Sequence, residues 1–345
     1  MQKGNKYGIH RVIEPADALP QPAWKIDNTM EIYDNEILID VQTLNIDSAS
    51  FTQIKEEAAG DEEKIKARIQ QIVNERGKHH NPVTGSGGML IGEVQKIGKE
   101  LNDRDIQEGD KIASLVSLSL TPLKIDEIVD IKKDIDQVHI KGKAVLFASG
   151  IYAKLPTDMS ETLALAVLDV AGAPAQTAKL VYPGNTVLVI GAGGKSGLLS
   201  LYQAQKQAGI TGKVIALEYS EEACSRIEEL GLADEVIQGD ATDGVRIYEK
   251  VNEITGGHLA DVVINNVNIP NTEMASIMAT RDGGVIYFFS MATSFTKAAL
   301  GAEGIGKDVE MIIGNGYTKG HAAIALQTIR ESDQLRKLFN QLYTH

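Results

Sequence analysis

The stretch from Val187 to Leu199, VLVIGAGGKSGLL, joins an apolar run to a glycine-rich turn and a second apolar segment. The first run predicts a buried strand, and the residues after Gly194 predict a helix. The turn therefore lies where the N–H groups of a helix start can bind phosphate. Two kinds of phosphate-binding loop compete for it: "GKS" indicates an ATP-binding loop, whereas the glycines indicate a dinucleotide-binding turn.

The ATP-binding loop needs the pattern G-x-x-x-x-G-K-[ST], and its first glycine would fall on Val189, inside the strand. The dinucleotide pattern fits better. Gly191 allows the tight turn, Gly194 lets the backbone approach a pyrophosphate, and Gly197 lets the helix pack closely on the sheet. The spacing is G-x-x-G-x-x-G, and Ser196 holds the third glycine position of the more usual register.

An acidic residue follows at the expected distance. Glu218 ends the predicted strand 213–218, where a carboxylate binds the adenosine ribose hydroxyls and disfavours a 2′-phosphate, which predicts NAD over NADP. A solvated strand end is the alternative. Lys195 is directed to solvent or to a phosphate, without a catalytic role. The predicted cofactor-binding residues are Gly191, Gly194, Lys195, Ser196, Gly197, Glu218, Asp240, Asn266 and Ser290.

The order of predicted helices and strands along the chain indicates an α/β protein with two domains. From about residue 160, helices alternate with apolar strands at 186–190, 213–218, 235–238, 260–266, 283–290 and 309–315, which indicates a doubly wound parallel sheet. Before it, strands at 36–46, 87–98, 109–125 and 142–148 and one helix over 61–77 indicate a compact β domain. A helical segment is predicted over 160–180, with Ser160 as its N-cap.

Composition narrows the function classes. The formal net charge of −13 disfavours nucleic acid and anionic membranes as partners. Cys224 is the single cysteine, which excludes an intramolecular disulfide and fits the cytoplasm. The N-terminal residues have no signal-peptide core, and no apolar run approaches 18 residues, so no membrane span is expected.

The chain as a whole resembles the medium-chain dehydrogenase/reductase superfamily. The resemblance rests on EILIDVQTLNIDSAS (36–50), GSGGMLIGEVQKIG (85–98), GDKIAS (109–114) and YPGNTVLVIGAGGKSGLL (182–199). It implies a GroES-like catalytic domain over 1–159, completed by 317–345, and a Rossmann NAD-binding domain over 160–316. It also implies a homodimer formed through the last Rossmann strand.

More narrowly, NPVTGSGGMLIGEVQKIG (81–98) and GNGYTKGHAAIAL (314–326) resemble the NAD-dependent amine dehydrogenases of lysine fermentation. That resemblance implies oxidative deamination of L-erythro-3,5-diaminohexanoate to 5-amino-3-oxohexanoate. Many superfamily members hold a catalytic zinc ion. Here Asp47 falls at the first ligand position, Gly88 at the histidine position and Asp169 near the third, so the chemistry is predicted to be metal-free.

Asp47 and Asp169 are the candidate catalytic residues. Either carboxylate could bind a substrate ammonium group or remove its proton. Alternatively, Asp47 caps a turn and Asp169 is a polar helix position paired with a neighbour. The candidate substrate-binding residues are His80, Thr84, Ser86 and Glu310. His80 follows His79 directly, and a role in a surface loop is the alternative for these two histidines. Interface stabilisation is the alternative for Glu310. Two other functions stay open: a zinc-free quinone or enoyl reductase, and a dinucleotide-binding sensor without turnover.

Overall fold

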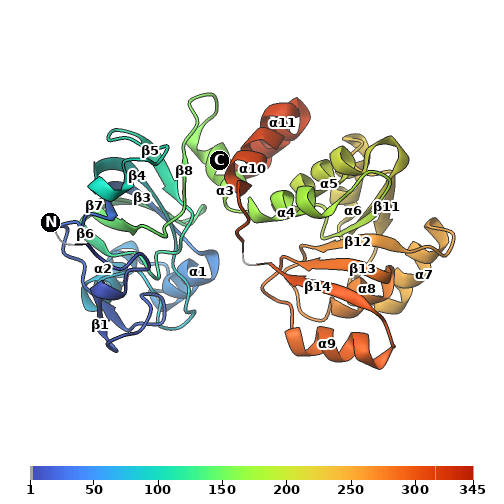
Figure 1. Ribbon diagram of the computed structural model, residues 1–345, viewed down its shortest axis with the longest axis horizontal. Coiled ribbons are helices and arrows are strands. Elements are labelled where there is room, and N and C mark those ends of the chain that lie inside the picture. The colour runs from blue at the N-terminus through green and yellow to red at the C-terminus, as the bar shows by residue number, and fades with distance from the viewer. Residues whose placement is uncertain (1–2, 315, 345) are drawn as a thin grey trace. The chain divides into compact units, whose positions relative to one another are not determined.

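The computed structural model describes residues 3–314 and 316–344. The chain divides into two compact units, residues 1–158 and 159–345 (Figure 1). Each unit is built around its own six-stranded sheet.

The second unit holds a wholly parallel sheet with the strand order β11-β10-β9-β12-β13-β14 (Figure 1). The strands are β9 Thr186–Ile190, β10 Lys213–Glu218, β11 Glu235–Gln238, β12 Ala260–Asn265, β13 Thr280–Phe288 and β14 Val309–Ile313. In sequence terms this is the order 3-2-1-4-5-6 of a dinucleotide-binding sheet, and it reverses between β9 and β12. The predicted doubly wound sheet is confirmed. The last predicted strand ends at Ile313, and its predicted end, Asn315, lies outside the described residues.

Helices cover both faces of this sheet, with α4 and α5 on one face and α7, α8 and α9 on the other (Figure 1). The helices of the unit are α3 Glu161–Leu168, α4 Gly172–Leu180, α5 Lys195–Ala208, α6 Glu221–Glu229, α7 Gly244–Ile254, α8 Glu273–Ala279, α9 Phe295–Gly304, α10 His321–Glu331 and α11 Asp333–Tyr343. Because both faces are covered, the central strands carry uninterrupted apolar segments rather than an alternating pattern. Val187, Leu188, Val189 and Ile190 of β9 are all fully buried.

The helical segment predicted over 160–180 is confirmed with Ser160 as its N-cap, but it is divided into α3 and α4, with Asp169–Ala171 between them. Pro174 explains the break: it has no N–H to donate and its ring clashes inside a helix, so it is tolerated only near a helix start. Here it is the third residue of α4.

The two C-terminal helices pack within the second unit. α10 packs against α3, α4 and α5, and α11 packs against α3 and α10. Leu326 and Ile329 of α10 and Leu335 and Phe339 of α11 are buried. Residues 317–345 were predicted to complete the first domain, whereas they belong to the second compact unit. The segment forms two helices with apolar faces and no closing strand among its described residues.

The first unit holds an antiparallel sheet with the order β6-β7-β3-β4-β5-β8 and a small hairpin of β1 and β2. The strands are β1 Val12–Glu14, β2 Lys25–Ile26, β3 Glu36–Ile46, β4 Gly88–Ile97, β5 Lys111–Ser114, β6 Leu123–Lys132, β7 Gln137–Phe147 and β8 Tyr152–Lys154. The predicted β domain is therefore confirmed, with strand 109–125 divided between β5 and β6.

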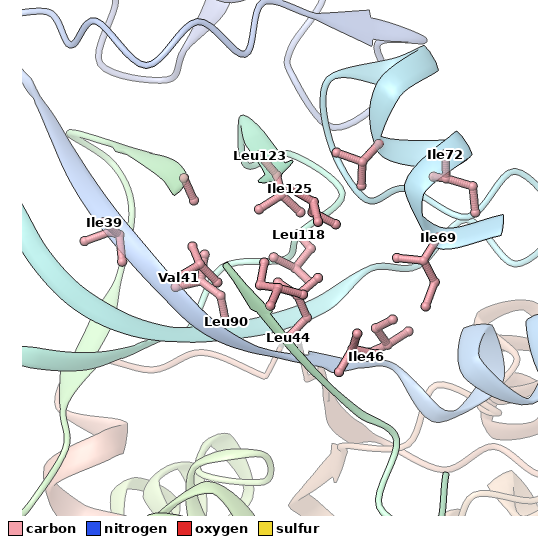
Figure 2. Close-up of a cluster of buried hydrophobic side chains, with 14 of the residues drawn as sticks. Ile39, Val41, Leu44, Ile46, Ile69, Ile72, Leu90, Leu118, Leu123 and Ile125 are labelled. Carbon is pink, nitrogen blue, oxygen red and sulfur yellow. The ribbon is translucent and has the colours of Figure 1, made fainter. Parts of the chain in front are cut away.

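Two helices, α1 Ser48–Glu57 and α2 Glu62–Arg76, accompany this sheet, whereas one was predicted. Ile69 and Ile72 of α2 join the inward side chains of β3, β4 and β6, among them Leu44, Leu90 and Ile125, in one apolar core (Figure 2). This core fixes the end of β3, after which Asp47 begins α1.

Candidate active site

The glycine turn connects β9 to α5 in the backbone geometry that the sequence predicts. Gly191 has φ +73°, and a Cβ atom there would lie 2.6 Å from Val267 Cγ2. A Cβ atom on Gly197 would lie 2.2 Å from the carbonyl oxygen of Gly191. A Cβ atom on Gly194 would have no neighbour within 4 Å. Gly194 also begins α5 without a side-chain cap, so the first N–H groups of this helix are available to an anion.

Glu218 lies beside this turn. Its Oε2 accepts the N–H of Gly193 at 2.8 Å, and its Oε1 accepts the N–H groups of Tyr219 and Ser220 at 2.8 and 3.1 Å. Glu218 therefore holds the glycine turn as well as the end of β10. Its binding to a ribose stays a prediction.

A cavity of about 420 Å³ opens next to Glu218 and Gly191. Asp240 and Thr242 form another part of its wall, where Asp240 accepts both the N–H and the hydroxyl of Thr242 at 2.8 Å. Its apolar walls come from Leu217, Val267 and Ile269. The cavity is within the volume range of small-ligand pockets, and its position at the carboxyl ends of parallel strands is the usual ligand site of such sheets.

Asn266 directly follows β12 and has buried amide atoms, Oδ1 and Nδ2, without a hydrogen-bond partner among the described residues. Buried polar atoms without partners are costly, so they mark a place where a ligand or water completes the site. Ser290, just after β13, accepts the N–H of Ala292 at 3.1 Å. The open Gly194, the cavity and the unsatisfied Asn266 together fit a bound dinucleotide.

Lys195 and Asp169 form an ion pair, with Lys195 Nζ 2.6 Å from Asp169 Oδ2. Asp169 is the residue at which α3 ends, and Lys195 is the first residue of α5. Lys195 also lies 5.9 Å from the ring centroid of Tyr343. The ion pair with Lys195 agrees with the alternative that Asp169 is a polar helix position paired with a neighbour. A catalytic role for Asp169 and a cofactor role for Lys195 stay predictions.

In the first unit, three of the predicted residues meet in one polar cluster. Asp47 caps α1 by accepting the N–H of Ala49 at 3.1 Å, and its Oδ1 also accepts the hydroxyl of Ser86 at 2.9 Å. Ser86 Oγ lies 2.5 Å from Ser50 Oγ, which lies 2.5 Å from Thr84 Oγ1. We call Asp47, Ser50, Thr84 and Ser86 the hydroxyl cluster. Asp47 and Thr84 are exposed, whereas Ser50 is fully buried.

Asn81 holds the loop that carries the hydroxyl cluster. Its Oδ1 accepts the N–H groups of Val83 and Thr84 at 2.8 and 3.3 Å, and its Nδ2 donates to Gln53 of α1 at 2.8 Å. Asn81 is fully buried. The loop is thus fixed against α1, which places Thr84 and Ser86 beside Asp47.

The two adjacent histidines lie in different surroundings. His79 is fully buried, so the surface-loop alternative is wrong for it. His80 is half-buried, and burial together with the charges of Lys78 and Arg76 lowers its pKa to about 4. The lowered pKa favours the neutral imidazole at pH 7, which can accept a hydrogen bond there but is a weak base and a poor charged partner for a substrate carboxylate.

Within residues 3–314 and 316–344, no three His, Cys, Asp or Glu side chains gather as potential metal ligands. At Gly88, φ is +111° and a Cβ atom would lie 2.1 Å from the carbonyl oxygen of Asn45. A histidine cannot occupy this position without a backbone shift. Metal independence of the reaction stays a prediction.

Glu310 lies on β14, the edge strand, with its side chain exposed. β14 pairs only with β13 among the described strands, and two strands, β12 and β13, separate it from β9 and the glycine turn. Within the described residues, no helix has the length and apolar content required to cross a membrane.

The sheet order, the glycine turn and the antiparallel domain define a medium-chain dehydrogenase/reductase. Solved structures agree with this fold. A Pseudomonas syringae quinone oxidoreductase is 19% identical, with a TM-score of 0.53 over 91% of this chain and 84% of that one. A mycobacterial protein complexed with NADPH is 16% identical, with a TM-score of 0.55 over 92% of this chain and 84% of that one.

Two family models match the chain: the L-erythro-3,5-diaminohexanoate dehydrogenase N-terminal domain over residues 10–156, and the zinc-binding dehydrogenase model over residues 197–311. The L-erythro-3,5-diaminohexanoate dehydrogenase of Acetoanaerobium sticklandii is 64% identical over 99% of both chains. That of Fusobacterium nucleatum subsp. nucleatum is 60% identical over 99% of this chain and all of its own. The chain belongs to the L-erythro-3,5-diaminohexanoate dehydrogenase family.

Sequence reasoning did not find Ser50, Asn81 or the cavity residues Tyr219 and Ile269. Asp47 is of a residue type that begins helices, and this signal could have predicted α1 and placed Ser50 in its first turn. The contacts of Asn81 connect a loop to a helix, and no local sequence pattern reports them.

Proposed function

We propose that this protein catalyses the NAD-dependent oxidative deamination of L-erythro-3,5-diaminohexanoate. The products are 5-amino-3-oxohexanoate, ammonium, NADH and a proton, and one water molecule is consumed. The observation that carries the proposal is the 64% and 60% identity, across 99% of this chain, to two relatives named for this substrate. The single cysteine, which cannot form an intramolecular disulfide, favours the cytoplasm as its location.

The residues around the glycine turn would hold the dinucleotide. The N-terminus of α5 and the open side of Gly194 suit the pyrophosphate, and the cavity beside Glu218 and Asp240 suits the adenosine. Asn266 supplies amide groups for the opposite half. When bound, the nicotinamide accepts a hydride from the substrate carbon that carries the reacting amine. The chain's own residues bind and orient the two reactants and accept the proton that the amine loses.

Glu218 supports NAD over NADP, because its carboxylate at the cavity would repel a ribose 2′-phosphate. We expect Glu218→Gln to reduce the preference for NADH over NADPH by about tenfold or more, the range for losing a hydrogen bond to a charged group. Fluorescence titration of both cofactors measures the preference. Glu222→Gln, which removes an exposed acid of α6 paired with Arg226, is the matched control and should leave it unchanged.

The proposed assembly is a homodimer in which β14 pairs with its copy. β14 is an edge strand, and an unpaired edge can extend the sheet across a two-fold axis. Ile313 at its end is 59% exposed, which gives this edge apolar surface to bury.

The activity is tested by following NADH formation from L-erythro-3,5-diaminohexanoate at alkaline pH, with release of one ammonium per NADH. The same preparation is assayed for NADPH oxidation with a quinone. Turnover of the diamino acid is the expected result. Turnover with the quinone alone would identify a reductase, and cofactor binding without either reaction would identify a sensor.

A further inference from the structure

The hydroxyl cluster has a fixed direction of hydrogen bonding. Ser86 uses its one hydroxyl proton to donate to the Asp47 carboxylate, so Ser86 must accept from Ser50. Ser50 then has no proton left, so it must accept from Thr84. Every proton of the chain Thr84, Ser50, Ser86 is thereby used within the cluster.

The groups that remain free in this cluster are acceptors. Among the described residues, Oδ2 of Asp47 accepts no hydrogen bond, whereas Oδ1 accepts two. The exposed Thr84 oxygen has two further long contacts, both with Ser86: the hydroxyl oxygen at 3.3 Å and the N–H at 3.4 Å. Because the Ser86 hydroxyl proton is used on Asp47, only the weak N–H contact competes for the acceptor position of Thr84. A ligand that satisfies a carboxylate oxygen and hydroxyl oxygens without offering acceptors is a primary ammonium, which carries three N–H donors.

We propose that the hydroxyl cluster binds the ammonium group that the substrate keeps, at C5, rather than the amine that is oxidised at C3. This inference rests on the proposed function. Oxidation requires the reacting nitrogen to lose a proton, whereas a carboxylate and hydroxyl acceptors favour the charged ammonium. The cluster would therefore oppose the reaction at the amine that it holds. Asp47 accordingly acts as a binding residue and not as the general base.

The chain offers a matched pair of variants for a test. Ser86→Ala removes the hydroxyl that joins Asp47 to Ser50, and Asp47→Asn removes the charge while keeping a residue that caps helices well. Ser48→Ala is the control, because Ser48 lies on the same helix but donates to Asp136 instead. Each protein is assayed with L-erythro-3,5-diaminohexanoate and with 3-aminohexanoate, which lacks only the C5 amine.

We expect Asp47→Asn to lower kcat/KM for the diamino acid about ten- to a hundredfold, mainly through KM, and to leave the value for 3-aminohexanoate unchanged. Ser86→Ala should act in the same direction to a smaller extent, and Ser48→Ala should match the wild type. If Asp47→Asn lowers kcat equally for both substrates, the carboxylate acts on the reacting amine and the proposal is overturned.

Binding distinguishes this proposal from the proposed function. If the wild type oxidises neither substrate, the proposed function fails, and calorimetric titration with the diamino acid still examines the cluster. Binding weakened by Asp47→Asn but not by Ser48→Ala supports an ammonium site, whereas equal affinity in all three proteins refutes it.

Discussion

At the scale of single residues, the three glycines of the turn, Gly191, Gly194 and Gly197, differ in the space around their Cα atoms. Gly191 and Gly197 have no room for a side chain, because a Cβ atom would meet Val267 or the carbonyl of Gly191. Gly194 has room, at a φ of −81° that any residue adopts. The fold therefore does not require glycine at this position, and its lack of a side chain is consistent with the proposed cofactor site.

This difference predicts opposite behaviour of two alanine variants. Gly194→Ala should change the free energy of unfolding by less than about 0.5 kcal/mol, while the Kd for NADH rises by about tenfold, equivalent to ~1.4 kcal/mol. Gly197→Ala should destabilise the protein by about 1–3 kcal/mol through overpacking. Urea denaturation and NADH titration measure the two effects. An unchanged Kd in Gly194→Ala would remove Gly194 from the cofactor site.

The sequence predicts the residues of the turn well, because strand, glycines, helix and acid follow one another within about thirty residues and each has a local cause. It predicts the partners of side chains poorly. The contact of Lys195 with Asp169 spans 26 residues, and that of Asp47 with Ser86 spans 39. Such pairs depend on how the elements pack, which periodicity does not report.

At the scale of elements, the strands were more predictable than the short helices. β9 and β12 contain the apolar runs Val187–Ile190 and Val262–Ile264, whereas α1 buries only Ser50, Phe51 and Ile54 and carries many polar residues. Its helical conformation depends on the Asp47 cap and on packing against the core of the first unit.

A buried ion pair joins the N-terminal segment to β3. Arg11 and Glu36 are almost completely buried, and their side chains form two hydrogen bonds of 2.7 Å. Burial alone would raise the pKa of Glu36, but hydrogen bonds from Arg11, His10 and the Tyr33 N–H outweigh it and lower the pKa to about 2. The carboxylate therefore stabilises the folded state above the unfolded pKa of 4.5, and this stability is lost as the pH falls from 4.5 towards 2.

We expect Glu36→Gln to destabilise the protein by about 3–5 kcal/mol at pH 7, because it leaves the Arg11 charge buried without its partner. The difference between wild type and variant should shrink by about 2 kcal/mol between pH 7 and pH 3, the part of this window that the measurement covers. Urea midpoints from pH 7 to pH 3 measure it. Glu127→Gln, which removes an exposed partner of Lys141, is the control. A difference that stays constant with pH would contradict the assignment.

At the scale of the whole molecule, the alternation of strands and helices predicts the parallel sheet and its class, because right-handed crossovers restrict the possible strand orders. The surface against which the C-terminal helices α10 and α11 pack could not be predicted in the same way. The amphipathic faces of α10 and α11 could cover either unit, and the choice depends on complementary apolar surfaces that lie far away in sequence.

The proposed dimer gives a prediction at this scale. The wild type should have twice the 37.2-kDa mass of the chain in light scattering. Ile313→Asp should shift it towards the monomer, because a charge at the end of β14 would be buried on pairing. Ile210→Asp changes a fully exposed isoleucine away from β14 and should remain dimeric. A wild type that is monomeric at micromolar concentration would exclude this assembly.

The contact between Glu218 and the Gly193 N–H has a consequence for protein engineering. Replacement of Glu218 by a basic or aliphatic residue is one route to an NADP-dependent variant, but such a residue has no side-chain oxygen to accept the Gly193 N–H and hold the glycine turn to the end of β10. A successful redesign has to supply a second acceptor for Gly193 along with the new ribose contact. Cofactor preference in this protein is therefore a property of two coupled positions, and libraries that vary Glu218 alone will select for a loosened turn.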